Sequence, residues 1–359
     1  MIVGIDGRSL ARGQAGRGVA HYTASLVAAL AEGFPADRWR AVVPGGAASA
    51  GEGVEVVAPR APRRALFAAA ALARRPRLDR MAAPCDVVWL PAPAPVALSP
   101  GARYVLTVHD LSFEERPGDY TRYERAWHRL GRLGALARGA ARVMAVSQAT
   151  RDAAVARWGV DPGRTSVVAP GVSRPARPPD VEAARARHGL PGRYLLWVGA
   201  LEPRKAPDLM ARAYARARAQ GLDAALAVVG EGRERLDGEG VHRLGAIADR
   251  RELEALYAGA LALVMPSRAE GHGLPPLEAA ACGTPAVVTE LPALRETLGD
   301  AVLHVPVDDE AALAAALLRV AGDAGLRAAL ASAAGARVAD RTWEAAARQA
   351  HDVIEEAAG

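Results

Sequence analysis

The sequence contains two cysteines, a single lysine and no long apolar segment. Cys85 and Cys282 lie far apart and neither has a second cysteine nearby, so neither a disulfide framework nor a zinc site is indicated. The longest uninterrupted apolar run, residues 65–73, falls far short of the roughly 18–20 residues that cross a bilayer as a helix. The first residues lack a basic leader followed by an apolar run, so no secretion signal is predicted. We expect a cytoplasmic protein with ordinary core thiols.

Lysine is scarce although the chain is basic. Among 45 lysines and arginines only Lys205 is a lysine. The net charge of +5 would suit an anionic partner, but heavy use of Ala, Arg and Gly is also typical of a GC-rich genome, and we predict no nucleic-acid partner. A compact ammonium can point one concentrated charge at a single oxygen, which the planar guanidinium cannot. The lone lysine therefore marks a position where that property is needed.

Short β-branched runs alternate with Ala/Leu-rich stretches along the chain, a pattern typical of parallel βαβ units. A length of 359 residues favours two domains. Four prolines between residues 170 and 179 indicate a boundary. We predict an α/β fold with a Rossmann-like domain at 1–175, a linker at 176–189 and a second Rossmann-like domain at 190–341. Two doubly wound sheets facing each other would leave a cleft lined by the carboxyl ends of their strands.

The expected strands of the two halves follow from the same pattern. They lie at 2–6, 39–44, 54–58, 86–90, 104–110 and 142–147 in the first half, and at 194–200, 225–232, 241–247, 260–267, 284–290 and 301–307 in the second.

The most specific motif lies in residues 266–290, where seven residues separate Glu270 from Glu278. A Gly-rich turn after Glu270 opens an expected helix at 275–282, and the first backbone N–H groups of such a helix favour an anion. Glu278, inside that helix, is placed to accept hydrogen bonds from sugar hydroxyls. The alternative is a solvated glutamate on an ordinary helix.

The stretch EGHGLPPLEA resembles the Glu-x7-Glu signature of retaining glycosyltransferases of family 4, with His272 where an aromatic residue is usual. The segments WVGALEPRKAPDLMARAYA and LGAIADRRELEALYAGALALVMPS resemble further segments of that family in the same order. In the first half, GRGVAHYTASLVAAL, TVHDLSF, AVSQATRD and VVAPGV do so too. The resemblance covers nearly the whole chain and is strongest to the mannosyltransferase-B-like branch.

The resemblance implies the GT-B fold, in which the first domain binds the acceptor and the second binds the nucleotide sugar. It also implies a last helix that crosses back, so we assign residues 342–359 to the first domain. The expected reaction is the retaining transfer of a sugar from a nucleoside diphosphate sugar to a hydroxyl acceptor such as a glycan, a glycolipid or a small-molecule glycoside. GDP-mannose is the favoured donor, and a UDP- or dTDP-sugar is the alternative.

The departing diphosphate needs a counter-charge. Because no Asp-x-Asp motif stands at a strand end, we expect no metal and no cofactor, and assign the charge to the protein. The predicted diphosphate-binding residues are Gly16, Gly18, Arg204, Lys205, Gly271, His272, Gly273 and Leu274. A simple turn is the alternative interpretation of the glycines at 16 and 18.

The remaining roles follow from the resemblance. It places His109 near the donor sugar, Glu270 at the sugar hydroxyls and Glu278 at the ribose. It places Ala246 and Ile247 at the nucleobase. The predicted catalytic residues are thus His109, Arg204, Lys205 and Glu270. For His109, a structural histidine that bonds to Asp110 or a backbone carbonyl is the alternative.

Residues 60–80 carry seven arginines and one acidic residue around an apolar run with Leu66, Phe67 and Leu72. As a helix, this stretch would suit peripheral contact with an anionic membrane surface, and the alternative is a solvated or acceptor-side helix.

Three other functions are compatible with parts of the pattern. A sugar-nucleotide epimerase and a non-catalytic sugar-nucleotide-binding protein share the expected fold, but neither accounts for the Arg-Lys and Glu-x7-Glu pairing. A dehydrogenase is disfavoured because residues 228–235, VVGEGRER, lack the complete Gly-x-Gly-x-x-Gly fingerprint.

Overall fold

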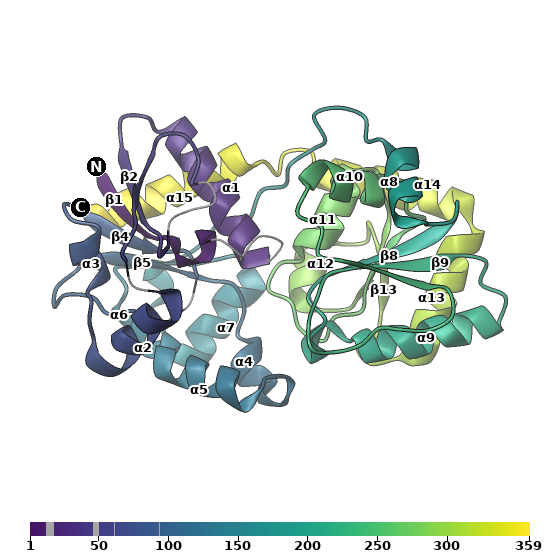
Figure 1. Cartoon of the computed structure of the whole chain (residues 1–359), viewed down its shortest axis with the longest axis horizontal. Coiled ribbons are helices and arrows are strands. Elements are labelled where there is room, and N and C mark those ends of the chain that lie inside the picture. Colours follow the sequence, from purple (N-terminus) through teal and green to yellow (C-terminus); the bar gives the residue numbers. More distant parts are fainter. Residues whose placement is uncertain (12–17, 46–49, 61, 93) are drawn as a thin grey trace. The chain divides into compact units, whose positions relative to one another are not determined.

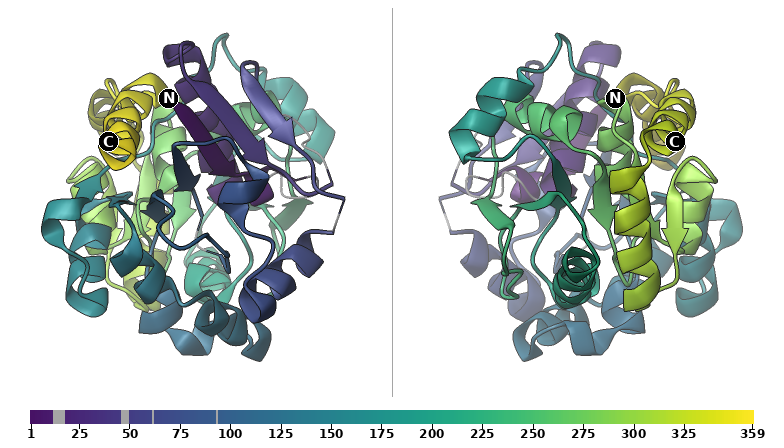
Figure 2. Two further views of the ribbon diagram at one scale, coloured as in Figure 1. Left: turned by 90° about the vertical axis from the view of Figure 1, so that its left-hand side faces the viewer. Right: turned by 90° about the vertical axis from the view of Figure 1, so that its right-hand side faces the viewer.

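The computed structural model describes residues 1–11, 18–45, 50–60, 62–92 and 94–359. Within these residues the chain forms two compact units. The first comprises residues 1–171 together with 342–359, and the second comprises residues 172–341. Each unit is a parallel sheet with helices on its faces (Figure 1, Figure 2), so the predicted α/β class is confirmed for both.

The first unit is built on a parallel sheet with the strand order β3-β2-β1-β4-β5-β6-β7. Its central strands are buried along their whole length, as expected where helices cover both faces. The strands are β1 (Ile2–Asp6), β2 (Arg38–Val42), β3 (Val54–Val57), β4 (Val87–Leu90), β5 (Tyr104–Val108), β6 (Arg142–Ala145) and β7 (Thr165–Val167). The helices are η1 (Gly7–Leu10), α1 (Gly18–Gly33), α2 (Arg63–Ala73), α3 (Leu78–Met81), α4 (Ser112–Glu115), η2 (Pro117–Asp119), α5 (Arg122–Gly131), α6 (Leu133–Gly139), α7 (Gln148–Trp158), η3 (Pro162–Arg164) and α15 (Trp343–Ala358).

The second unit has a parallel sheet with the strand order β10-β9-β8-β11-β12-β13. The strands are β8 (Tyr194–Val198), β9 (Ala225–Val229), β10 (Val241–Gly245), β11 (Leu263–Met265), β12 (Ala286–Thr289) and β13 (Leu303–Val305). The helices are α8 (Val181–His188), η4 (Pro203–Lys205), α9 (Pro207–Ala219), α10 (Arg250–Gly259), α11 (Leu274–Ala281), α12 (Pro292–Leu298), α13 (Glu310–Gly322) and α14 (Ala324–Arg337). Every strand expected in either half overlaps one of these strands.

The last helix, α15, belongs to the core of the first unit. It packs along α1, and its Trp343 and Ile354 join the same buried cluster as Leu26 and Leu30 of α1. Ile354 is fully buried. The core of the first unit is therefore built from the two ends of the described chain.

The predicted linker at 176–189 is wrong. Residues 181–188 form α8, whose Ala184 is buried in the core of the second unit. The helix packs on α10, where His188 lies 2.8 Å from Glu252. Asp180 caps the first turn by accepting from the N–H of Ala183. This capping residue directly follows the proline-rich stretch, which the sequence analysis took as part of a linker. The second unit thus begins at Val172 rather than at 190.

The basic stretch at 60–80 does not form one exposed amphipathic helix. The helix α2 ends at Ala73, the next residue, Arg74, adopts the left-handed conformation, and a separate short helix, α3, begins at Leu78. Leu66 and Phe67 are buried. Two of the three apolar side chains expected on a membrane-facing surface therefore pack inside the first unit.

Candidate functional site

The candidate site residues of the second unit follow the carboxyl ends of neighbouring strands. From β8 the chain adds β9 and β10 on one side and then returns to place β11 on the other side, so the strand order reverses between β8 and β11. Open α/β sheets bind ligands at such a reversal. Arg204 and Lys205 follow β8, and Glu270 follows β11. The sheet topology therefore brings the predicted residues to one place.

Lys205 and Glu270, which are 65 positions apart, form an ion pair. The Lys205 Nζ donates to Glu270 Oε1 at 2.5 Å, and the two side chains are 13% and 8% exposed. At such burial either charge alone would be costly, whereas the pair is tolerated because each ion solvates the other. The ammonium and the carboxylate thus lie side by side.

Arg204 has a different carboxylate partner. Its Nε donates to Glu202 Oε2 at 3.1 Å. The backbone turn around it is tight, with the Lys205 N–H bonded to the Glu202 carbonyl at 2.9 Å and the Ala206 N–H to the Pro203 carbonyl at 3.0 Å. The two neighbouring basic side chains are therefore held by separate acidic residues.

The predicted turn at Gly271, His272, Gly273 and Leu274 leads into α11. Gly273 has a φ of 87°, and a Cβ there would overlap the side chain of Leu294, so this position requires glycine. The His272 side chain is 6% exposed. Residues 275 and 276 are prolines without N–H groups, so the donors at this helix start are restricted to the backbone of the turn and of later residues.

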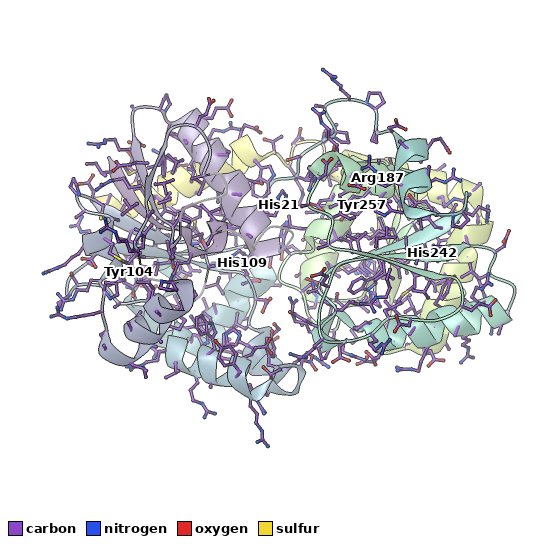
Figure 3. All side chains as sticks on the ribbon, in the orientation of Figure 1. His21, Tyr104, His109, Arg187, His242 and Tyr257 are labelled. Carbon is purple, nitrogen blue, oxygen red and sulfur yellow. The ribbon has the colours of Figure 1, made fainter. Side chains whose placement is uncertain are left out.

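Glu278 is buried on α11 and is held at both oxygens. Its Oε1 accepts from Arg250 Nη1 at 2.6 Å and its Oε2 accepts from the Tyr257 hydroxyl at 2.8 Å. Burial raises the pKa of the Tyr257 phenol well above its usual value, and the Glu278 charge raises it further. Burial opposes the Arg250 charge, but Glu278 and Glu254 outweigh it and raise the pKa of that guanidinium. Tyr257 is visible on α10 in Figure 3. The carboxylate is thus fixed in one orientation.

Ala246 and Ile247 lie in the loop between β10 and α10. Ala246 is exposed, whereas Ile247 packs against the hydrophobic core. Asp249 ends the loop by capping α10, accepting from the Arg251 N–H at 2.9 Å. The loop is thus anchored next to Arg250, the partner of Glu278.

In the first unit, His109 follows β5 and joins it to the end of β4. Its Nε2 lies 2.7 Å from the Pro91 carbonyl. Because a carbonyl only accepts, Nε2 carries the proton and Nδ1 of the neutral ring is an acceptor. The Tyr22 ring meets it edge-on at 4.8 Å between centroids, and burial lowers the pKa of the imidazole. Figure 3 shows His109 at this sheet edge. The structural hydrogen bond expected as an alternative is present and leaves Nδ1 for another donor.

The other predicted residues of the first unit are Gly16 and Gly18. Gly16 lies outside the described residues. Gly18 is the first residue of α1, and a Cβ there would meet nothing within 4 Å, so a glycine is not sterically required at this position.

Three side chains that the sequence analysis did not single out contact the candidate site. Arg250 and Tyr257 bind Glu278, and Arg268 binds the turn that carries Arg204. Arg268 falls within the motif stretch 266–290, but its acidic partners lie 40 and 60 positions away in the chain. Spacing along the sequence therefore gave no sign of its role.

Neither a metal-binding cluster nor a membrane-spanning helix is found among the described residues. In the described ranges, no group of three or more His, Cys, Asp or Glu side chains is placed to hold a metal ion. Likewise, no helix in the described part of the chain has both the length and the apolar character needed to cross a bilayer.

Comparison with known proteins identifies two family models in the chain. Glycosyltransferase Family 4 matches residues 9–174, and Glycosyl transferases group 1 matches residues 192–323. Similar sequences include the D-inositol 3-phosphate glycosyltransferases of Frankia alni, 36% identical over 233 residues, and of Streptomyces bingchenggensis, 36% identical over 243 residues. The alignments cover 58% and 60% of this chain. They cover 57% and 53% of the relatives, so the chain spans little more than half of their length.

Solved structures resemble the chain over nearly all of its length. Sucrose-phosphate synthase from Thermosynechococcus elongatus has a TM-score of 0.77 at 21% identity, covering 99% of this chain and 98% of that one. Anabaena Alr3699/HepE in complex with UDP and glucose has a TM-score of 0.70 at 20% identity, covering 99% of both chains. At such identities the likeness concerns the fold, and it confirms the predicted GT-B class with two Rossmann-like domains.

The environment of His109 predicts a pH dependence of stability. Its pKa is lower in the folded chain than the ordinary 6.5, so the unfolded chain takes up the proton first as the pH falls. The free energy of unfolding should therefore decrease from about pH 7 to about pH 5, and part of that decrease should disappear in His109→Gln, whose amide can still donate to Pro91. Chemical denaturation at both pH values measures the difference.

His242→Gln, a substitution in the second unit, is the matched control and should keep the wild-type pH dependence. If the free energy of unfolding of His109→Gln depended on pH as in the wild type, the buried His109 imidazole would not be a source of the pH dependence.

Proposed function

Because the chain belongs to glycosyltransferase family 4, we propose that it transfers a sugar from a nucleoside diphosphate sugar to a hydroxyl acceptor, with retention of configuration and without a metal. The observation that carries this proposal is the meeting of Lys205 and Glu270 beside Arg204, where the strand order of the second sheet reverses. It supports a donor site in the second unit. The first unit would then bind the acceptor.

The basic turn would stabilise the leaving group. As the bond from the anomeric carbon to the diphosphate breaks, negative charge builds on the phosphate oxygen. The Lys205 ammonium directs one charge at a single oxygen, whereas the Arg204 guanidinium can bind two oxygens at once. Backbone N–H groups of Gly271, His272, Gly273 and Leu274 would add hydrogen bonds. The protein would thus supply the counter-charge assigned to a metal in other transferases.

Glu270 would exchange partners when the donor binds. In the structure its carboxylate accepts from Lys205. A diphosphate that takes over the ammonium releases the carboxylate to accept from sugar hydroxyls. In the front-side step, the acceptor oxygen bonds to the anomeric carbon on the face that the phosphate leaves, and the acceptor proton passes to a phosphate oxygen. The Nδ1 of His109 would accept a hydrogen bond from the donor sugar and fix its position.

The nucleoside would occupy the other strand ends of the second unit. Glu278 would accept from the ribose hydroxyls, because each carboxylate oxygen can accept a further hydrogen bond beside those from Arg250 and Tyr257. Ala246 and Ile247 would line the nucleobase. The support for this placement is the sheet order, in which β10 and β9 extend the sheet away from the reversal at β8.

GDP-mannose is the proposed donor, on the resemblance to the mannosyltransferase-B-like branch. A UDP-sugar is the second candidate, because the structural relative HepE binds UDP and glucose. The proposed acceptor is a hydroxyl of a glycan, a glycolipid or a small-molecule glycoside. Inositol 3-phosphate is a further acceptor to test, since the sequence relatives are named for it.

A screen of donors tests the function directly. Thermal shift and nucleotide release are measured for the purified chain with GDP-, UDP-, ADP- and dTDP-sugars, with and without acceptors. We expect the largest stabilisation with GDP-mannose, because a ligand that binds the folded state raises the melting temperature. Nucleotide release that requires an acceptor excludes an epimerase. A response to UDP-sugars alone would overturn the GDP-mannose preference, and no response to any sugar nucleotide would contradict the proposed function.

Replacing the lone lysine tests the proposed counter-charge. Lys205→Arg keeps the charge, but the guanidinium is larger and planar, and the Lys205 side chain is only 13% exposed with its Nζ 2.5 Å from Glu270. We expect turnover to fall about tenfold or more while the melting temperature changes little. Steady-state transfer rates and thermal melts measure both effects.

The matched control is Arg193→Lys, an exchange at a half-exposed arginine of the same unit, and it should leave turnover unchanged. Near-normal turnover in Lys205→Arg would remove Lys205 from the proposed mechanism.

Peripheral contact with an anionic membrane is a further part of the proposal, with α2 and α5 as the contact surface. Of the apolar side chains on α2, Leu72 is 76% exposed. The buried Phe67 meets Trp127 of α5 edge-on at 4.4 Å between ring centroids, which places the two helices side by side. Among its described residues α5 buries none, and it exposes Tyr123 and Leu130. Arginines are exposed on both helices or at their ends, at positions 74, 75, 122, 125 and 129.

Vesicle sedimentation tests this surface. Binding should occur with vesicles that contain phosphatidylglycerol and not with phosphatidylcholine alone, because each arginine near an anionic surface contributes about 1 kcal/mol. The combined change Arg74→Gln, Arg75→Gln, Arg125→Gln and Arg129→Gln should abolish sedimentation. The control change Arg216→Gln with Arg235→Gln, in the second unit, should leave sedimentation intact. Equal sedimentation of both variants would exclude this surface.

A further inference from the structure

Arg268 ties together three segments at the strand ends of the second unit. Its Nε donates to Asp308 Oδ1 at 2.6 Å, and its Nη1 donates to the Pro203 carbonyl at 2.7 Å. Nη1 and Nη2 each donate to one oxygen of Asp208 at 2.9 Å. Its backbone N–H donates to the Arg204 carbonyl at 2.7 Å. One residue thus holds the turn at 203–204, the start of α9 and the loop before α13.

Only an arginine can make this set of contacts. The guanidinium presents N–H groups on three nitrogens in one plane, and here all three are engaged by groups from different segments. A lysine concentrates its donors on a single atom and cannot span them. The side chain is 12% exposed, so water replaces few of these contacts.

Two of the three segments that Arg268 joins have backbone conformations that need support. Ala206, just after the basic turn, has a φ of 53°, and Asp308 has a φ of 60°. Within the described residues, four non-glycine positions have a positive φ, and these are two of them. A side chain with a Cβ is disfavoured in this region unless its surroundings hold it there. The contacts of Arg268 lie next to both positions.

The charges of this cluster reinforce the arrangement. The hydrogen bonds that the Arg268 guanidinium donates to Asp208 and Asp308 raise its pKa, although burial opposes them. Burial opposes ionisation of Asp208, but Arg268 outweighs it and lowers the pKa of that carboxyl. The raised pKa of Arg268 and the lowered pKa of Asp208 keep both of these groups charged near neutral pH, so their ion pair persists there.

We infer that Arg268 is a positioning residue that fixes the turn at 203–206, so that Arg204 and Lys205 meet the second phosphate of the donor. This inference rests on the proposed function. It adds a residue that would touch neither donor nor acceptor and would act through the backbone of Pro203 and Arg204. Its specific consequence is that Arg268 sets how much affinity the second phosphate contributes.

Arg212 provides the matched control. It donates to the same carboxylate, with its Nη1 3.3 Å from Asp208 Oδ2, and its Nε lies 3.1 Å from Glu310. Its side chain is 53% exposed on α9. In the described part of the chain it makes its hydrogen bonds and ion pairs with Asp208 and Glu310 and none with residues 203–206. Arg212→Lys therefore disturbs the same aspartate without releasing the turn.

The experiment compares the dissociation constants of a nucleoside monophosphate and the matching diphosphate, GMP with GDP and UMP with UDP, by calorimetry on the full chain. In Arg268→Lys, diphosphate affinity should fall about tenfold or more, because at least one charge-assisted contact of the turn is lost, whereas monophosphate affinity should change less than about threefold. Arg212→Lys should keep the wild-type ratio of diphosphate affinity to monophosphate affinity. A general loss of structure would lower both affinities together, so the ratio separates positioning from folding.

Asp308→Asn is the second variant, in case Arg268→Lys does not fold. Asparagine accepts the left-handed conformation, so the backbone at 308 is retained while the charged tether to Arg268 is lost. The same ratio should fall, by a smaller factor. A wild-type ratio in the folded variants, or an equal loss of both affinities, would overturn the role of Arg268. If the wild-type chain binds neither diphosphate, the proposed function fails instead.

Discussion

Parallel pairing of the strands is the constraint on which the rest of this chain depends. Parallel strands all run in the same direction, so each connection must return the chain to the end of the sheet where the strands begin. The carboxyl ends of the strands of one sheet therefore all lie at one edge. The loops at that edge are outside the sheet ladder and can carry other contacts. In the second unit this edge gathers the turn at 203–205, the loop at 246–249 and the turn at 271–273 from distant parts of the sequence.

Ion pairs hold the charged side chains at this edge of the sheet. Lys205 pairs with Glu270, Arg204 with Glu202, and Arg250 with Glu278. Half-buried charges are screened little by salt, and removing one partner of such a pair costs more than the pair itself contributes. An incoming anion must therefore compete with carboxylates of the protein. A diphosphate can do so because it brings more than one negative charge.

The sequence predicted the sheets well because buried parallel strands consist of short apolar runs rich in β-branched residues. The resemblance to family 4 also placed Lys205 and Glu270 in one site, and in the structure the two side chains form an ion pair. The sequence did not predict contacts between distant side chains. Arg268 and the acidic residues it binds carry no common spacing, and Phe67 is buried against α5, which the local pattern around residue 67 does not reveal. The helix α8 was missed because prolines precede its capping residue.

The position of α15 affects the order in which the two units can fold during synthesis. The second unit, residues 172–341, is complete in the sequence before α15 begins. The core of the first unit includes Trp343 and Ile354, which a ribosome adds only after the whole of the second unit. Domains commonly fold in the order in which they emerge during synthesis. Here the unit that emerges first must wait with part of its hydrophobic surface uncovered, so the second unit can reach its native packing before the first.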